Sequence, residues 1–97
     1  MCIRDSPQSQ YKVNALFWIA ECSYQEKNYE EAIIKYDEII TTYPDHPKAS
    51  SALLKQGFSF LMIGDQTDGA LILKKVIERY PDSDQAEIAR RKLDTLR

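Results

Sequence analysis

The 97-residue chain is predicted to fold as an all-α repeat protein, and two observations carry this prediction. The first is internal repetition. The Tyr-Pro-Asp closure around Pro44 returns around Pro81, a shift of 37 residues from 44 to 81, and a period of this size is typical of stacked helical units. The second is that apolar residues recur every three or four positions, the spacing of one helix face. We therefore expect two helix hairpins followed by a terminal helix, with no strand.

The stretch 28–44 shows the start and stop signals of a helix most clearly. Asn28 is expected to cap its N-terminus through the side chain, with Glu31 reaching back to the N–H of the cap. Pro44 ends the helix, because proline cannot continue the hydrogen-bond ladder. The expected apolar stripe consists of Ala32, Ile33, Tyr36, Ile39, Ile40 and Tyr43.

Four further helices are expected over about 9–26, 47–63, 65–80 and 83–96. The first has apolar side chains around more than one face, which suits a helix contacted on two sides. His46, Asp65 and Ser83 are expected at N-caps, and Pro47 takes a first-turn position where its missing N–H costs nothing. The apolar side of the fourth helix is expected at Leu71, Leu73, Val76 and Ile77. The last helix has a charged outer face, which a terminal capping helix needs.

Small residues mark the expected helix crossings. Under the 37-residue shift Gly57 takes the place of Ala20, and Gly69 that of Ala32. A glycine inside a helix costs about 0.5 to 1 kcal/mol relative to alanine, so close helix approach is the expected compensation. Gly64 is expected to end the third helix in the left-handed conformation.

The domain assignment follows the repeat. Residues 1–6 are assigned to a non-native or disordered N-terminal segment and residues 7–97 to one domain. Repeat one is expected at about 9–44, repeat two at about 46–81 and the capping helix at about 83–96. Pro7 lies where the closing proline of a preceding unit would be, since 7 plus 37 is 44. We therefore expect the chain to begin inside a larger array and to end with its capping helix.

Composition excludes several classes of partner. With 13 basic and 15 acidic residues the net charge is −2, and no block of basic residues forms a footprint for nucleic acid. No apolar run approaches the roughly 20 residues of a membrane helix, and the start lacks the apolar core of a secretion signal. Neither nucleic-acid binding nor direct membrane insertion is expected.

No catalytic, cofactor-binding or metal site is predicted. The one histidine, His46, stands at a helix start, where it cannot form a catalytic dyad or a histidine-rich metal site by itself. The glycines match no phosphate-binding loop. Cys22 is expected to be a buried free thiol rather than the disulfide partner of Cys2, because an even count of cysteines is weak evidence for a bridge. Trp18 is expected to be buried or half-buried by packing rather than to serve as a ligand platform.

The pattern resembles the tetratricopeptide repeat family, whose unit is a helix pair of about 34 residues. The matching positions are Leu16, Ile19, Ala20, Tyr24, Tyr29, Ala32, Tyr36 and Pro44 in the first unit and Leu53, Gly57, Phe60, Gly64, Asp65, Gly69 and Pro81 in the second. Gln56, in place of an apolar residue, and Asp94, in place of a small one, depart from the pattern. The resemblance implies a right-handed superhelix of two helix hairpins plus a C-terminal capping helix, and a non-enzymatic protein–protein interaction module.

Within that family, the spacing, the closures, the opening 14–19 and the closing helix 86–96 resemble the C-terminal domain of the Tol-Pal system protein YbgF family, the periplasmic cell division coordinators of Gram-negative bacteria. The resemblance implies a periplasmic protein that trimerises through a coiled coil absent here. It also implies that TolA and peptidoglycan-synthesis proteins are partners, so that peptidoglycan synthesis is linked with outer-membrane constriction. The alternatives are a repeat scaffold of an outer-membrane assembly lipoprotein and a generic cytosolic adaptor.

Partner-binding residues are expected on the concave face, which the first helix of each stacked pair lines. They are Asn14, Phe17, Glu21, Gln25, Ser51, Leu54, Phe58, Met62, Ile88 and Arg91, with Thr95 continuing the row. The apolar members suit a helix or an extended apolar segment held mainly by apolar burial. The Lys and Asn clamp by which members of the family hold a terminal carboxylate is not expected, because the residues there are Phe17, Glu21, Leu54 and Phe58. An open alternative is that a preceding helix covers part of this row.

Overall fold

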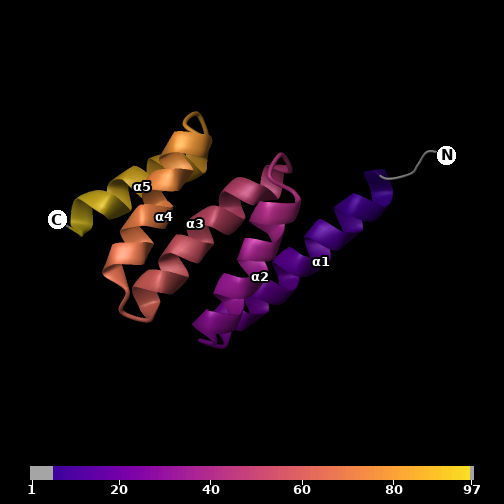
Figure 1. The fold of residues 1–97 in the computed structure, drawn as a ribbon, viewed down its shortest axis with the longest axis horizontal. Coiled ribbons are helices and arrows are strands. Elements are labelled where there is room, and N and C mark those ends of the chain that lie inside the picture. The colour runs from indigo at the N-terminus through magenta and orange to yellow at the C-terminus, as the bar shows by residue number, and fades with distance from the viewer. Residues whose placement is uncertain (1–5, 97) are drawn as a thin grey trace.

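The computed structural model describes residues 6–96, and these residues form five α-helices joined by short loops (Figure 1). Their bounds are Ser6–Gln25 for α1, Tyr29–Thr42 for α2, Pro47–Met62 for α3, Gln66–Arg79 for α4 and Asp84–Thr95 for α5. No strand occurs in this range. The prediction of an all-α fold with two hairpins and a terminal helix is confirmed.

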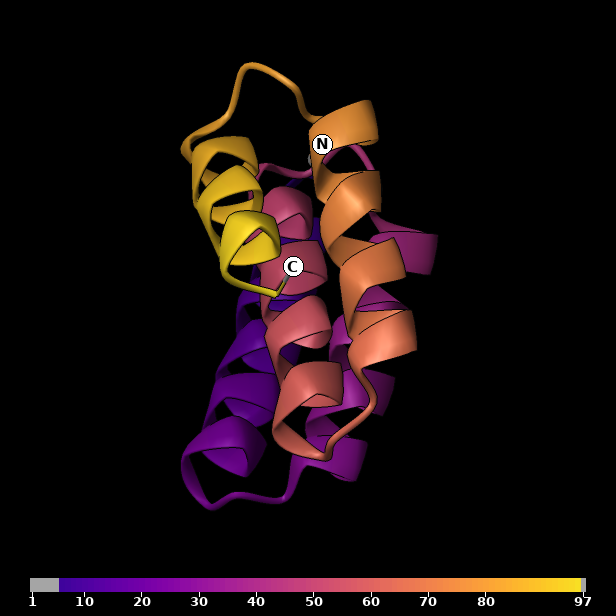
Figure 2. The ribbon, with the colours of Figure 1, turned by 90° about the vertical axis from the view of Figure 1, so that its left-hand side faces the viewer.

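The helices stack in sequence order and make two layers. In Figure 2, α1, α3 and α5 form one layer, and α2 and α4 lie beside them in the other. Each helix contacts its neighbour in the chain, and α3 also contacts α1 and α5 across its own layer. The stack measures 51 × 30 × 16 Å, so it is an elongated slab one helix pair thick. This is the arrangement of a helical repeat array, in which each unit touches only adjacent units.

The core runs between the two layers along the whole stack. The α2 stripe is confirmed at Ala32, Tyr36, Ile39 and Ile40, which are buried, while Ile33 and Tyr43 are half-buried. The other buried apolar side chains are Val13, Ala20, Ala49, Ala52, Leu53, Leu54, Leu73, Val76, Ala86 and Ala89. The expectation for α4 is wrong at Leu71, which is 53% exposed, because the packed stripe runs through Leu73 and Val76. Gln56 is buried as well, and its amide donates to the Ile33 backbone oxygen at 3.1 Å.

The glycines at the crossing of α3 and α4 hold the two helices close together. A Cβ on Gly57 would lie 2.9 Å from Cδ2 of Leu73, and one on Gly69 would lie 2.5 Å from Cδ2 of Leu61. Both distances are shorter than ordinary van der Waals contact, so a side chain would have to displace a neighbour. The equivalent residues of the first hairpin, Ala20 and Ala32, are fully buried. The predicted close approach is confirmed.

Caps form where the sequence predicts them, with one exception. Lys48 N donates to Nδ1 of His46, Asp68 N donates to Oδ1 of Asp65, and Ala86 N donates to the Ser83 hydroxyl. The expected side-chain cap at Asn28 is absent, although its backbone angles nearly match those of Asp65. The backbone is therefore placed for a cap at both residues, but only the Asp65 side chain accepts the hydrogen bond.

Positive φ angles occur at equivalent turns of the two hairpins. Gly64 has φ +89°, as predicted for the residue that ends α3. Lys27 has φ +66° and is the counterpart of Gly64 under the 37-residue shift. A lysine in this conformation is strained relative to glycine, so the first turn is built at a local cost that the second avoids.

Helix α1 departs most from expectation. It begins at Ser6, so Pro7 lies in its first turn, whereas Pro44 and Pro81 lie in loops. Cys22 is exposed rather than buried, and it is a free thiol. One face of α1 is open rather than covered, as Ile19 at 47% exposure shows. Cys2 and most of the segment assigned to residues 1–6 lie outside the described residues.

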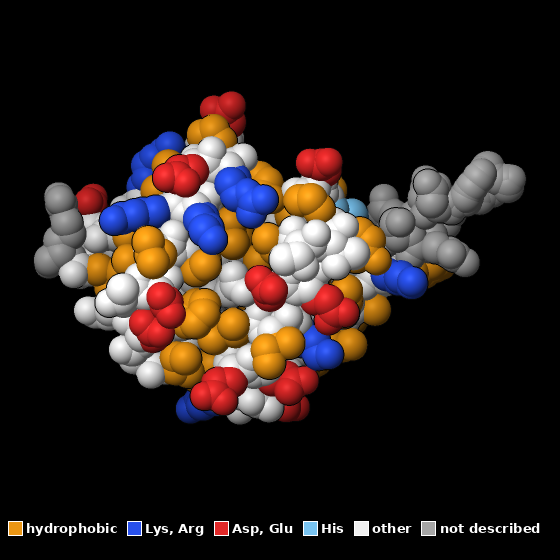
Figure 3. Space-filling view, in the orientation of Figure 1, with side chains coloured by type: hydrophobic (Ala, Val, Ile, Leu, Met, Phe, Trp, Pro, Cys, Tyr) orange, Lys and Arg blue, Asp and Glu red, His pale blue; other side chains and the backbone are white. Residues whose placement is uncertain are grey.

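The face formed by α2 and α4 carries a mixed surface (Figure 3). Acidic and basic side chains separate its apolar patches, and lysines and arginines gather over α4 and α5. In residues 6–96 no helix is both long and apolar enough to span a bilayer.

Candidate protein-binding groove

A hollow of 620 Å³ lies on the opposite layer, between the first helices of the two repeats. Its walls are Asn14, Phe17, Trp18 and Glu21 from α1 and Lys48 from α3. The four α1 residues recur at three- and four-residue spacing, which places them on one face of the helix. The sequence predicted three of them, Asn14, Phe17 and Glu21, as concave-face residues, and the structure brings these three together.

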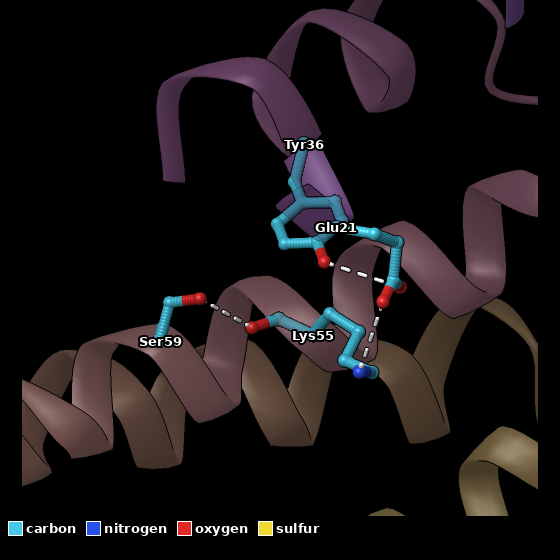
Figure 4. A network of polar contacts seen from close by, with 4 residues as sticks. All are labelled: Glu21, Tyr36, Lys55 and Ser59. Atoms are coloured by element: carbon cyan, nitrogen blue, oxygen red, sulfur yellow. Dashed lines mark hydrogen bonds and ion pairs between the residues drawn. The ribbon is translucent and has the colours of Figure 1, made fainter. Parts of the chain in front are cut away.

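Glu21 of α1 lines this hollow, and its carboxylate contacts side chains from α2 and α3 (Figure 4). The hydroxyl of Tyr36, from α2, donates to Oε2 of Glu21 at 3.3 Å, and Nζ of Lys55, from α3, lies 3.5 Å from Oε1. Ser59 adds to the network by donating to the Lys55 backbone oxygen at 2.9 Å. An ion pair with partly exposed partners contributes about 0 to 1 kcal/mol. Its main effect is therefore to fix the positions of the two charged side chains.

The two tyrosines near Glu21 remain neutral at physiological pH. Burial is the largest effect raising the pKa of Tyr36, and the charge of Glu21 and the hydrogen bond to it add to the shift. Burial also raises the pKa of Tyr24, with smaller contributions from Tyr29 and Glu21. Because the pKa of both tyrosines lies above the usual value for tyrosine, neither hydroxyl acts as a base, and that of Tyr36 donates to Glu21.

Lysine side chains fold over the aromatic rings of the groove. Nζ of Lys48 lies 4.9 Å from the ring centre of Phe17, and Nζ of Lys55 lies 4.5 Å from that of Tyr24. Such contacts are worth roughly 0.5 to 1 kcal/mol at exposed sites. The row that the sequence suggested to be apolar is therefore mixed, with cations placed directly on its aromatic members.

A second hollow of 200 Å³ lies further along the same layer. Its walls are Tyr24, Phe58, Leu61, Met62 and Lys92. Met62 is 56% exposed, and its flexible thioether can adapt to ligands of different shape. Phe58 and Met62 were predicted for the concave face, and the structure places both in this hollow.

The other predicted site residues are dispersed. Leu54 is only 5% exposed and belongs to the core, so it supports the groove from beneath and offers no surface to a partner. The Ser51 hydroxyl accepts a hydrogen bond from Nε2 of Gln85 at 3.0 Å. Gln25 is exposed but lines neither hollow.

The predicted residues of α5 lie beyond the two hollows. Ile88 is 41% exposed, and Arg91 pairs with Glu87 on its own helix at 3.5 Å. The Thr95 hydroxyl donates to the Lys92 backbone oxygen at 2.7 Å. A binding role for these residues stays a prediction.

The predicted set lacked five residues that line the two hollows, which are Trp18, Lys48, Tyr24, Leu61 and Lys92. Trp18 was expected to be buried or half-buried but is 71% exposed and lines the first hollow. Lys48 and Lys55 were not considered, although they continue the three- and four-residue spacing of Ser51 and Phe58 along α3. That spacing would have placed both lysines on the helix face of Ser51 and Phe58. Lys48 lines the first hollow, and Lys55 contacts Glu21 and Tyr24 from beside the hollows.

Two stacked helix hairpins with hollows along the layer of α1, α3 and α5 define a helical repeat protein. The family model for the tetratricopeptide repeat matches residues 14–46 and 51–83, and the chain belongs to this family. The match confirms the resemblance to the tetratricopeptide repeat.

Among curated proteins, the chain is similar to the outer membrane protein assembly factor BamD of Caulobacter vibrioides. The two sequences are 33% identical in an alignment 99 positions long, which covers 94% of this chain and 32% of the relative. The chain therefore spans about a third of the length of that relative. The finer resemblance to the periplasmic division coordinators is not confirmed by these matches.

Proposed function

We propose that this chain is a protein-binding repeat module that acts in outer-membrane protein assembly in the periplasm, without catalytic activity. The observation that carries the proposal is the groove formed by the two hollows along α1, α3 and α5. In its first hollow the exposed ring of Trp18 and the ring of Phe17 line the wall. Membership of the repeat family supports a role in protein binding. The likeness to an outer membrane protein assembly factor supports the process and the compartment.

Of the two functions considered from the sequence, this proposal prefers the outer-membrane assembly scaffold to the cell division coordinator. The role of a division coordinator, with TolA and peptidoglycan-synthesis proteins as partners, draws no support from the relatives found. The assembly role draws support from a relative that matches almost the whole chain.

The chemistry of the groove indicates the kind of segment it would hold. Trp18 and Phe17 offer aromatic surface, and Lys48 beside them offers a cation. A partner segment that places an aromatic or aliphatic side chain against Trp18, with a carboxylate near Lys48, would satisfy both. Phe58 and Met62 in the second hollow would receive another apolar side chain further along the segment.

The test is site-specific photocross-linking in a Gram-negative host that produces the full-length protein. A photoreactive phenylalanine derivative at position 18 samples the groove, and the same residue at position 74, which is exposed on α4, serves as the control. We expect cross-links to outer-membrane assembly proteins or their clients from position 18 only. Cross-links from position 18 to TolA or to peptidoglycan synthases would overturn the assembly role. Equal products from both positions would show that the groove is not the binding site.

Affinity measurements with a captured partner would then test the residues. Trp18→Ala should weaken binding by roughly tenfold or more, as truncation of a hot-spot aromatic does. Ile34→Ala is the matched control, because Ile34 is 63% exposed but lies on α2, outside both hollows.

A further inference from the structure

The outer layer of the stack, formed by α2 and α4, carries an exposed apolar residue at the same place in each repeat. Ile34 of α2 is 63% exposed and Leu71 of α4 is 53% exposed, and the two are counterparts under the 37-residue shift. Ala32 and Tyr36, two positions before and after Ile34, are fully buried, and two positions along a helix are about 200° apart. Ile34 therefore points directly away from the core, and Leu71 does the same on α4.

This outward side is not a surface that stacked repeats cover. Helix α4 contacts α3 before it and α5 after it, so it has a neighbour on each side in the stack. Leu71 is nevertheless exposed, because the stack grows sideways and leaves the outer layer open. Ile34 and Leu71 also line neither hollow of the groove. The outer layer is therefore a second surface, separate from the proposed binding site.

The charges beside the two apolar residues are opposite in sign. One turn after Ile34 come Asp37 and Glu38, and their counterparts under the 37-residue shift are Lys74 and Lys75. All four side chains are exposed. As a whole, α2 carries four carboxylates and one lysine, whereas α4 carries three basic and two acidic side chains. The outer layer is thus acidic over α2, and basic side chains gather over α4 and α5 (Figure 3).

A layer with this pattern is complementary to itself. The second helices of the two hairpins, α2 and α4, run in the same direction (Figure 1). A two-fold axis parallel to them and midway between them would lay α2 of each copy along α4 of the other. Because Ile34 and Leu71 are counterparts, they would then meet at the same height. We propose that the outer layer binds the same layer of a second copy of this chain, in a two-fold symmetric dimer.

The flanks of the two helices match in this dimer as well. Asp37 and Lys74 lean toward the next helix of the stack, since Asp37 lies 3.5 Å from Nε2 of Gln56 on α3 and Lys74 borders a hollow against α5. Glu38 leans the opposite way, toward α1, and Lys75 is its counterpart. The two-fold axis reverses the order of the helices, so Asp37 meets Lys75 of the other copy and Glu38 meets Lys74. Both contacts join a carboxylate to an ammonium group.

Charge selects this arrangement over the other symmetric one. A two-fold axis perpendicular to the helices would lay α2 on α2, and its four carboxylates would face each other, which like charges at an interface oppose. The proposed dimer brings together one like pair, Glu31 and Asp68. Both belong to the first turn of a helix, where the dipole stabilises negative charge. Two exposed apolar residues in each copy are few for a permanent dimer, so the association is weak and reversible.

The association can be measured by sedimentation equilibrium of the chain at roughly 10 µM to 1 mM, the range of weak affinities. A reducing agent is needed, because Cys22 is an exposed thiol. We expect a reversible dimer at low salt. Raising the salt from about 0.05 to 0.5 M should lower the association constant at least about threefold, because the paired charges are exposed in the free chain and salt screens them.

Charge reversal tests which helices meet. The double change Lys74→Glu and Lys75→Glu makes both helices acidic, and the double change Asp37→Lys and Glu38→Lys makes both basic. Each variant alone should associate at least about tenfold more weakly than the unchanged chain. An equimolar mixture should recover the association constant to within about threefold, because both contacts of the mixed dimer then pair an acidic with a basic helix. Recovery in the mixture also shows that the variants are folded.

Three single changes locate the contact. Ile34→Asp places a charge opposite Leu71 of the other copy and should weaken association at least about tenfold. Ile19→Asp is the matched control, because Ile19 is exposed on α1, at the open end of the stack. It should leave association unchanged. Trp18→Ala, in the groove, should also leave it unchanged, so that loss of groove binding and loss of dimerisation are separate results.

Several outcomes would overturn the proposal. A chain that stays monomeric at the highest concentration and low salt has no such interface, and a mixture of folded charge variants that fails to associate would show that α2 does not meet α4. A dimer that Ile19→Asp breaks and Ile34→Asp does not would place the contact on the open end of the stack. Binding of another protein through Ile34, without self-association, would assign the layer to that protein. If circular dichroism shows that a charge variant has lost its helices, the salt dependence of the unchanged chain and the pair Ile34→Asp and Ile19→Asp decide the question.

Discussion

Gly69, at the crossing of α4 and α3, allows the packing of the stack to be tested with one methyl group. A Cβ at this position would lie 2.5 Å from Cδ2 and 2.8 Å from Cγ of Leu61, and 3.2 Å from the Gly57 backbone oxygen. Overpacking of this kind costs about 1 to 3 kcal/mol, while replacing a helical glycine by alanine returns about 1 kcal/mol of helix propensity. We expect Gly69→Ala to lower the free energy of unfolding by about 1 kcal/mol net.

The assay is urea unfolding followed by circular dichroism at 222 nm, in which a loss of this size moves the midpoint by roughly 0.5 to 1 M. The background variant Leu61→Ala removes the two atoms that clash most, so Gly69→Ala should stabilise that protein rather than destabilise it. This reversal of sign is a coupling between neighbours that a double-mutant cycle measures directly. If Gly69→Ala raises the midpoint of the otherwise unchanged protein, the close approach of α3 and α4 is not what requires glycine there.

Three further predictions follow from the caps, the buried tyrosine and the groove. His46→Ala removes the acceptor for Lys48 N and should cost about 1 kcal/mol in urea unfolding, whereas His46→Asp should keep the cap; equal losses would show that the cap contributes nothing. The raised pKa of Tyr36 implies stability that is present in full below about pH 10, the ordinary value, and lost above it. Tyr36→Phe should therefore flatten the alkaline limb of the stability profile, and an unchanged limb would contradict this. Phe58→Ala should weaken partner binding, measured by calorimetry, without changing the helical content. Lys74→Ala, at an exposed position on α4, should leave the affinity unchanged. Equal affinities of the two variants would show that the second hollow is not part of the binding site.

The fold was predictable because its determinants are local. The caps at Asp65 and Ser83 depend on residues within one turn, and the repeat shift relates Gly57 to Ala20 without any structure. Periodicity identified the buried stripe of α2 for the same reason, since residues on one face of a helix share one environment.

The surface was less predictable, because spacing says which residues share a face but not what covers it. Cys22 and Ile19 lie on a face that α2 covers in the other repeat, and they are exposed only because no helix occupies that position here. Leu54 was expected at the surface but is buried. Lys55 turns back onto Tyr24, a contact between repeats that no pattern within one helix contains.

The helices of the stack should differ in the free energy of local unfolding, because they contact different numbers of other helices. This helix touches each of the other four described helices, whereas α5 touches only α4 and α3. Release of α5 therefore exposes the last hairpin and leaves the first one intact, so its amide protons should exchange with solvent at a lower free energy than those of α3. Such a chain can unfold locally at α5 while α3 stays folded. A ligand that contacts both α3 and α5 would raise the free energy of this local unfolding.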